Sequence, residues 1–175
     1  MPYCTETEKI YPKIEKYLGE RPIDIACGDA KVREDAFGVD GRDFPCVNYR
    51  TNTLYGLPNE MPFLKEQFTS LYSGHTIEHI HDHYRAIVEW SEFLQKGGYI
   101  ILYLPDGRYY NNTENLEHLH DTEYEKFLFW FKRVFCGEGK NYKGEPYLSP
   151  MYELIEHGLD VGEDRYSFFI VAKKI

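Results

Sequence analysis

Residues 22–30 read Pro22-Ile-Asp-Ile-Ala-Cys-Gly-Asp-Ala30, and Phe37-Gly-Val-Asp40 follows shortly after them. Both segments have the composition of short buried strands; the first runs into a glycine turn and the second ends in a carboxylate. In an open parallel sheet, ligands bind outside the carboxyl ends of the strands, and glycine lets the backbone approach a ligand closely. Because an ionised Asp40 can accept both hydroxyls of a ribose, the two segments predict a nucleoside-containing ligand.

The same residues also have a plainer interpretation. A buried strand followed by Gly28 is common, and Asp40-Gly41 alone is a frequent turn. The dinucleotide pattern G-x-G-x-x-G is absent, because Gly28 is the one glycine of its three that is present. From these two segments alone, nucleoside binding and an ordinary turn are equally open.

Length and composition favour one folded domain. The chain has 175 residues, of which 42% are hydrophobic and 17% aromatic, enough to bury a core. A net charge of −9, with no basic block longer than Lys173-Lys174, argues against a nucleic-acid substrate. We expect no signal peptide and no membrane span. The four cysteines form no Cys-x-x-Cys pair, which indicates reduced thiols and a cytoplasmic location.

Hydrophobic periodicity and turn residues predict strands that alternate with helices. The first predicted helix is Glu6–Leu18, in which Pro12 can delay the start. The second begins after an Asp82 cap and runs to about Gln95, where Gly97-Gly98 ends it. The third is capped by Asp121 and ends near Cys136-Gly137. The predicted strands are Pro22–Cys27, Ala36–Val39, Cys46–Arg50, Phe68–Ser73 and Tyr99–Leu104, with a closing hairpin of Met151–His157 and Arg165–Lys173 around Gly158–Asp164. This order indicates an α/β sheet with helices on both faces.

Four segments carry a resemblance to a known family. They are Asp24-Ile-Ala-Cys-Gly28, Gly38-Val-Asp40, Ser73-Gly-His-Thr-Ile-Glu-His-Ile-His-Asp82 and Trp90-Ser-Glu-Phe-Leu-Gln-Lys-Gly-Gly-Tyr-Ile-Ile-Leu-Tyr-Leu-Pro-Asp106. In this order the chain resembles the class I S-adenosylmethionine-dependent methyltransferases, in particular a small group with a shortened first helix. The resemblance runs from about residue 23 to residue 106. It implies a doubly wound, Rossmann-like sheet of seven mostly parallel strands with an antiparallel C-terminal hairpin.

The resemblance also implies a domain plan and a cofactor site. It divides a single domain into an N-terminal helix (1–20), a cofactor-binding half (21–106) and acceptor-side loops with the closing hairpin (107–175). The implied cofactor is S-adenosylmethionine, and the residues carried over to its site are Asp24, Ala26, Cys27, Gly28, Asp40, Gly41, Asn52, Thr53, Gly74 and His75. Ala26 and Ala30 depart from the family pattern, where glycine is usual, and Asn52 or Thr53 stands where an acidic residue is often found.

The candidates for catalysis are His75 and His79, which follow the fourth strand, and Asp106, which follows the fifth. The segment Leu-Pro-Asp-Gly around Asp106 is equally a type I or II turn. Methyl transfer depends mainly on alignment of donor and acceptor, and His is the side chain best able to take a proton near neutral pH. Glu78 is either a site carboxylate or a favourable anion in the first turn of a helix. The polar loop at 108–120 suits a small-molecule or glycan-like acceptor, although surface loops are polar in general.

Histidines crowd the segment from His75 to His83, which raises the alternative of a metal site. His79-Ile-His-Asp-His83 is one residue short of the H-x-H-x-D-H pattern of binuclear hydrolases, and metal sites tolerate little geometric error. His118, His120 and Asp121 are the later ligands that could be proposed. We therefore expect a methyltransferase without a metal. A binding module without catalysis of its own and a metal-dependent hydrolase are the alternatives.

Overall fold

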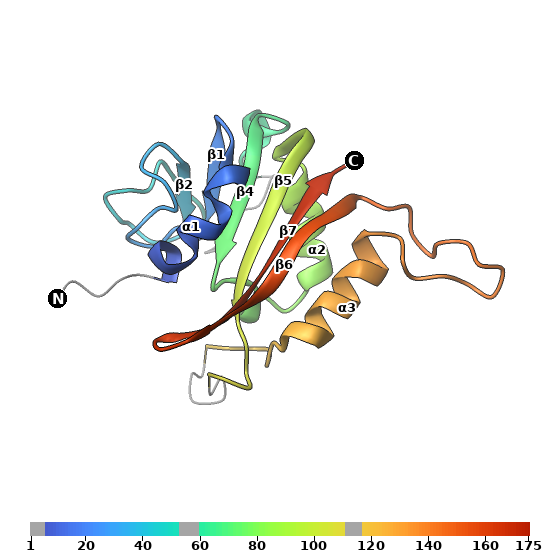
Figure 1. The fold of residues 1–175 in the computed structure, drawn as a ribbon. Helices are drawn as coiled ribbons and strands as arrows, with labels where there is room; N and C mark the ends of the chain where they lie inside the picture. The colour runs from blue at the N-terminus through green and yellow to red at the C-terminus, as the bar shows by residue number, and fades with distance from the viewer. Residues whose placement is uncertain (1–5, 53–59, 111–116) are drawn as a thin grey trace.

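The computed structural model describes residues 6–52, 60–110 and 117–175 as one sheet flanked by helices (Figure 1). The elements in chain order are α1 (Glu6–Leu18), β1 (Pro22–Ile25), β2 (Phe37–Asp40), β3 (Tyr49–Arg50), η1 (Pro62–Leu64), β4 (Phe68–Gly74), η2 (Ile77–His79), α2 (His83–Ser91), β5 (Leu94–Pro105), α3 (Tyr124–Phe135), β6 (Tyr152–Gly162) and β7 (Arg165–Lys174). None of the described helices is long and apolar enough to cross a bilayer.

The described residues form a seven-stranded sheet in the order β3-β2-β1-β4-β5-β7-β6. The first five strands of that order are parallel, and β7 pairs antiparallel with both β5 and β6. The predicted fold class is confirmed. The connection between β1 and β2 contains no helix, as its length predicts.

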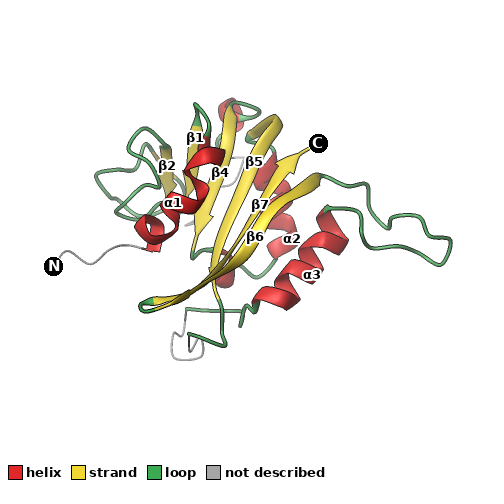
Figure 2. Cartoon of the chain, viewed as in Figure 1, coloured by secondary structure: helices red, strands yellow, loops and turns green. Residues whose placement is uncertain are grey.

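Helices cover both faces of the sheet, with α1 on one face and α2 and α3 on the other (Figures 1 and 2). The central strand β5 serves both layers, because successive side chains of a strand point to opposite faces. Ile101 and Tyr103 pack in the cluster that includes Ile10, Ile14 and Leu18 of α1. Ile100, Leu102 and Leu104 pack in the cluster that includes Trp90 of α2 and Phe131 of α3.

Two predicted element boundaries at the start of β5 are wrong. α2 begins after Asp82, whose side chain accepts the Arg85 N–H as predicted, but it ends at Ser91 and not near Gln95. Gly97-Gly98 does not end the helix; the two glycines lie inside β5, where its pairing with β4 is irregular between Phe68↔Leu94 and Ser70↔Tyr99. Glycine is favoured at position 98, because a Cβ there would lie 3.0 Å from the Thr69 carbonyl oxygen.

The first helix has the predicted range and the third does not have the predicted start. α1 spans Glu6–Leu18 and includes Pro12, so the proline does not delay its start. α3 begins at Tyr124, and Asp121 does not cap it. The Tyr124 N–H instead donates to the Asp106 carboxylate at 3.2 Å, a partner 18 positions away. A cap supplied from another element leaves no local sequence signal.

The closing hairpin is longer and tighter than predicted. Gly162 pairs with Arg165, so the two strands are joined by the two residues Glu163 and Asp164. Asp164 has φ 58°, which fits a tight turn of this kind. The predicted seven-residue loop at Gly158–Asp164 is therefore mostly strand β6.

Candidate functional site

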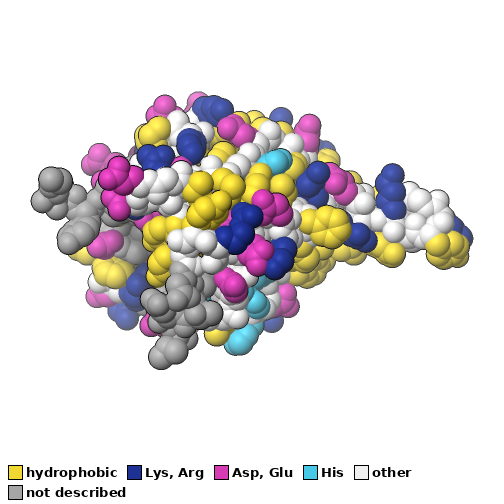
Figure 3. Space-filling model, turned by 60° about the horizontal axis from the view of Figure 1, so that its bottom comes forward, with side chains coloured by type: hydrophobic (Ala, Val, Ile, Leu, Met, Phe, Trp, Pro, Cys, Tyr) yellow, Lys and Arg dark blue, Asp and Glu magenta, His cyan; other side chains and the backbone are white. Residues whose placement is uncertain are grey.

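The carboxyl ends of β1, β2, β4 and β5 meet at one edge of the sheet, because these strands are parallel. Ala26, Asp40, Gly74 and Asp106 lie at or directly after these ends. Figure 3 turns this edge towards the viewer and shows acidic, basic and histidine side chains mixed across it. An edge of this kind is where open α/β sheets bind ligands.

The turn after β1 has an open backbone. Ala26 and Gly28 both have left-handed φ values, 58° and 59°. The nearest atom that a Cβ on Gly28 would meet is Nη2 of Arg42, at 3.8 Å, so space remains above this peptide. The turn is held by the Cys27 N–H, which donates to the Val39 carbonyl at 3.1 Å. A ligand can therefore approach the backbone of this turn closely.

Asp40, at the end of β2, is a fully buried and ionised carboxylate. It accepts the Gly28 N–H at 2.9 Å and the Arg42 N–H at 2.8 Å. The Arg42 guanidinium lies against it at 3.1 and 3.2 Å. Burial alone would raise the pKa of Asp40, but the hydrogen bonds from Arg42 and Gly28 outweigh it and hold that pKa below its usual value. The carboxylate therefore stays an acceptor at neutral pH.

Asp24, inside β1, has a different electrostatic state. Its side chain is 1% exposed, and one oxygen accepts the Val32 N–H at 2.6 Å. Burial raises the pKa of Asp24 to about 8, against smaller opposing effects of the Val32 bond and the Lys31 charge. The carboxyl is therefore neutral near pH 7 unless a cation comes close to it.

The remaining predicted cofactor residues differ in exposure. Cys27 is buried, and burial raises the pKa of its thiol, so it is not an activated nucleophile. Gly41 forms the turn between Asp40 and Arg42. Asn52 is exposed just beyond β3, at the same sheet edge as Asp40, and Thr53 lies outside the described residues.

Gly74 and His75 end β4 in a constrained turn. A Cβ on Gly74 would lie 2.3 Å from the Tyr72 hydroxyl oxygen, so any other residue would displace this buried tyrosine. His75 has φ 49°, a conformation that costs a non-glycine residue about 1–3 kcal/mol. Its N–H donates to the Tyr103 carbonyl at 2.8 Å. Strain of this size is typical of residues that a site holds in place.

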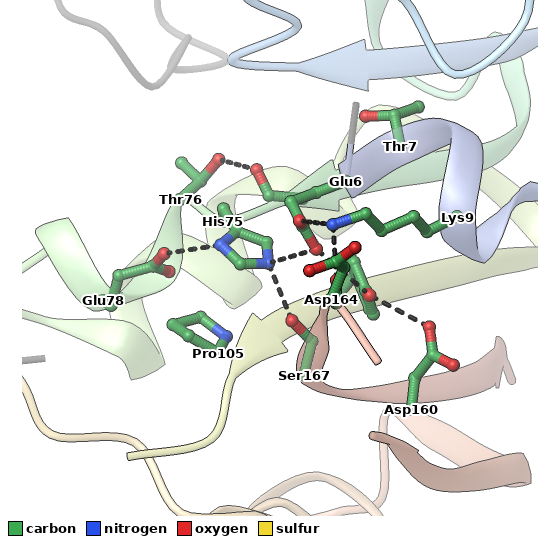
Figure 4. A network of polar contacts seen from close by, with 12 residues as sticks. Glu6, Thr7, Lys9, His75, Thr76, Glu78, Pro105, Asp160, Asp164 and Ser167 are labelled. Atoms are coloured by element: carbon green, nitrogen blue, oxygen red, sulfur yellow. Dashed lines mark hydrogen bonds and ion pairs between the residues drawn. The ribbon is translucent and has the colours of Figure 1, made fainter. Parts of the chain in front are cut away.

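The His75 ring lies between several polar groups (Figure 4). Nε2 is 3.0 Å from Ser167 Oγ and 3.8 Å from a Glu6 oxygen, and Nδ1 is 3.8 Å from Glu78 Oε1. Although 21% of the side chain is exposed, the surrounding protein desolvates the ring. This burial, together with the nearby His118 and His79, lowers the pKa of His75, so the imidazole is neutral at pH 7.

His79 and Glu78 lie on the short helix η2, and Asp106 lies elsewhere at the edge. His79 Nε2 is 3.9 Å from the same Glu78 oxygen that faces His75, so the structure brings the two histidines together around Glu78. The hydrogen bonds described for the Asp106 carboxylate come instead from Arg108 and from the Tyr124 N–H.

Two residues of this edge were not predicted. Arg42 covers Asp40, although Asp40-Gly-Arg42 is visible in the sequence as a carboxylate and a cation two positions apart. Ser167, on β7, contacts His75, and no local sequence pattern predicts a contact across 92 positions.

Comparison with known proteins relates the chain to the methyltransferases. Residues 23–102 match the family model described as a methyltransferase domain. The chain as a whole has the fold of solved S-adenosylmethionine-dependent methyltransferases. No curated protein matches the chain.

Solved methyltransferases share this fold at low sequence identity. The 1,6-didemethyltoxoflavin-N1-methyltransferase of Burkholderia thailandensis, bound to 1,6-didemethyltoxoflavin and S-adenosylhomocysteine, aligns with a TM-score of 0.63 and 9% identity over 98% of this chain and 79% of that one. S-adenosylmethionine-dependent methyltransferases of Aquifex aeolicus and Archaeoglobus fulgidus give TM-scores of 0.60 and 0.57 and identities of 12% and 13%. They cover 98% and 97% of this chain and 91% and 95% of theirs.

The edge described above suits the methyl donor of this family. The open peptide at Gly28 gives backbone access, and Asp40 supplies an ionised acceptor. A ribose could reach Asp40 only if the Arg42 guanidinium moved, because that group occupies part of the Asp40 carboxylate. The Arg42 side chain is 55% exposed, so it can turn into solvent.

Proposed function

We propose that this chain transfers the methyl group of S-adenosylmethionine to a polar small-molecule or glycan-like acceptor. The observation that carries the proposal is the buried, ionised Asp40 beside the open Gly28 turn. Ribose hydroxyls can replace the two guanidinium contacts of Arg42 without leaving a buried charge unpaired. The two backbone bonds from Gly28 and Arg42 would remain.

Asp24 is proposed to face the amino group of the methionine part. A cation near this carboxyl stabilises its charged form and offsets the burial that raises its pKa. The backbone of Ala26 to Gly28 would line the same part of the cofactor. Asn52 is proposed to meet the adenine edge, since an amide can both donate and accept there.

The acceptor is proposed to lie beside His75. Tyr166 stacks on Tyr110 at 4.5 Å between ring centroids, and His75 meets Tyr166 edge-on at 5.7 Å. Flat aromatic faces together with the Ser167 hydroxyl suit a ring that bears hydroxyl groups. The Burkholderia enzyme of similar fold holds a small-molecule acceptor, which supports the same class here.

Catalysis in this arrangement is mainly alignment. The cofactor supplies an activated methyl group, and the reaction is an in-line displacement that needs the acceptor atom held close and in line. The neutral His75 can accept a hydrogen bond from an acceptor hydroxyl. Its lowered pKa makes it an orienting group more than a strong base, and His79 and Asp106 stay predictions for catalysis.

Calorimetric titration with S-adenosylmethionine and S-adenosylhomocysteine tests the cofactor assignment. Asp40→Ala should weaken both about 10- to 150-fold, equivalent to about 1.5–3 kcal/mol for hydrogen bonds to a charged group. Asp43→Ala is the matched control, because Asp43 lies three positions away and is 87% exposed.

Equal affinity of wild type and Asp40→Ala would contradict the ribose assignment. Circular dichroism of each variant at the titration temperature separates lost binding from lost folding. Production of S-adenosylhomocysteine with hydroxylated small molecules then tests the acceptor. Binding without turnover on any acceptor would favour a binding module over an enzyme.

A further inference from the structure

A carboxylate and two imidazoles converge next to His75. Glu78, His79 and His118 each offer one ligand atom, and these atoms all lie within 4.8 Å of one another. The His79 and His118 rings meet edge to face, with centroids 4.7 Å apart. No other group of three such side chains this close is found in residues 6–52, 60–110 and 117–175.

Glu78 is the unusual member of this cluster. It is 0% exposed, and neither carboxylate oxygen has a hydrogen-bond partner within the described part of the chain. His75 Nδ1 lies 3.8 Å and His79 Nε2 3.9 Å from Glu78 Oε1, both beyond hydrogen-bond distance. A buried carboxylate without partners is costly, and a bound cation is one way to offset that cost.

His79 directs its Nε2 to this carboxylate. Its Nδ1 lies 2.9 Å from the Glu117 carbonyl oxygen. A carbonyl can only accept, so Nδ1 carries a proton, and Nε2 is the nitrogen whose lone pair a metal ion can use. A ring nitrogen held by a carbonyl while the other faces inward is the arrangement that metal-binding histidines adopt.

The backbone fixes His118 relative to Glu78. The N–H groups of Leu119 and His120 both donate to the Glu78 carbonyl, at 2.8 and 3.2 Å. The segment that carries His118 is thereby attached to η2 on both sides of the cluster, since the Glu117 carbonyl accepts from His79. The three side chains are therefore positioned by the fold itself, without help from a ligand.

We propose that Glu78, His79 and His118 bind one divalent transition-metal cation. Two imidazoles and one carboxylate are donors that suit Zn²⁺, and three protein ligands leave a coordination position open. That position can take an oxygen of the acceptor, a role that rests on the proposed function, whereas the binding of the cation does not. These ligands differ from the His79-to-His83 pattern considered from the sequence, because the third comes from residue 118.

Calorimetric titration of chelator-treated protein with Zn²⁺ tests the site. We expect one equivalent to bind with a dissociation constant of about 1 μM or lower. Glu78→Gln and His118→Gln should each weaken binding at least about 10-fold, because each removes a ligand. His81→Gln is the matched control, since His81 is an exposed histidine two positions from His79, and it should bind like the wild type.

Thermal unfolding of the metal-free variants shows whether a loss of binding comes from a loss of folding. Glu78→Gln should unfold at the same temperature as the wild type or higher, because it removes an uncompensated buried carboxylate. Absence of Zn²⁺ binding at 100-fold excess over the expected constant, on the order of 0.1 mM, would overturn the proposal. Binding that both ligand variants leave unchanged would overturn it too. Titration of the metal-free wild type with S-adenosylmethionine tests the proposed function separately.

Discussion

The tripeptide Asp-Gly-Arg occurs twice, at the end of β2 as Asp40-Gly41-Arg42 and after β5 as Asp106-Gly107-Arg108. Both aspartates are fully buried. In each turn the arginine N–H donates to Oδ1, at 2.8 and 3.0 Å, and the guanidinium contacts both carboxylate oxygens. The same local sequence thus builds the same local structure at two places on one sheet edge.

The two turns differ in what surrounds them. The third donor to Asp40 is the N–H of Gly28, in the open turn after β1, whereas the third donor to Asp106 is the N–H of Tyr124, at the start of α3. Arg42 is 55% exposed, while Arg108 is 38% exposed and also pairs with Glu125 at 2.8 Å. The first turn can open towards a ligand, and the second attaches a helix to the sheet.

The largest difference should appear when the carboxylates are removed. Asp106→Ala leaves the N–H groups of Arg108 and Tyr124 without their acceptor, and should lower the free energy of unfolding by about 3 kcal/mol. Its affinity for S-adenosylmethionine should stay within about threefold of the wild type, in contrast to Asp40→Ala. Urea denaturation and calorimetry measure the two effects. A stable Asp106→Ala protein that binds cofactor but has no turnover would instead place Asp106 in catalysis.

Removal of the arginines should give a smaller difference in the same direction. Arg108→Ala loses contacts to two carboxylates and should lower the free energy of unfolding more than Arg42→Ala, because the Arg42 ion pair is more exposed. Urea denaturation of both variants at pH 7 measures the two changes. Weaker cofactor binding in Arg42→Ala would show that this side chain contacts the ligand and does not merely cover Asp40.

The pH dependence of the arginine variants provides a control. Burial alone would raise the pKa of Asp106, but the hydrogen bonds from Arg108 hold that pKa below its usual value. A depressed carboxyl pKa stabilises the fold above the unfolded-state pKa, about 4, and that stability is lost as the pH falls through the folded-state pKa. The difference in the free energy of unfolding between wild type and Arg108→Ala should therefore be largest at pH 7 and become smaller below about pH 4.

The smallest predicted effect concerns the turn that faces Asp40. Ala26 has φ 58°, where glycine is favoured, so Ala26→Gly should raise the free energy of unfolding by about 1 kcal/mol. Ala30→Gly is the matched control, because Ala30 is not among the described residues with positive φ. That change should lower stability slightly, since glycine only adds freedom to the unfolded chain. Thermal unfolding measures the change in stability for both variants. A change of the same sign in Ala26→Gly and Ala30→Gly would contradict the strain at Ala26.

The sequence predicts the sheet because its buried strands are apolar and bounded by turn residues. It also indicates Asp40 through a strand ending in a carboxylate. It misplaces the start of α3 because the capping group is Asp106, far along the chain. It misplaces the start of β5 because a Gly-Gly pair is typical of a helix end, whereas Gly97-Gly98 lies where the pairing of β4 with β5 is irregular. The convergence of Glu78 with His118 depends on backbone contacts across about 40 positions, which no spacing rule encodes.

Strand β7, which follows the other six strands in the sequence, lies inside the sheet between β5 and β6. Its residues Phe168, Ile170 and Ala172 complete the core on the side of α3. The hairpin that it closes is also held to α1, where Lys13 pairs with Asp160 across 147 positions. Until β7 has left the ribosome, β5 therefore has an unpaired edge that can join other chains. The sheet cannot be completed before that point, and the nascent chain needs protection from aggregation until then.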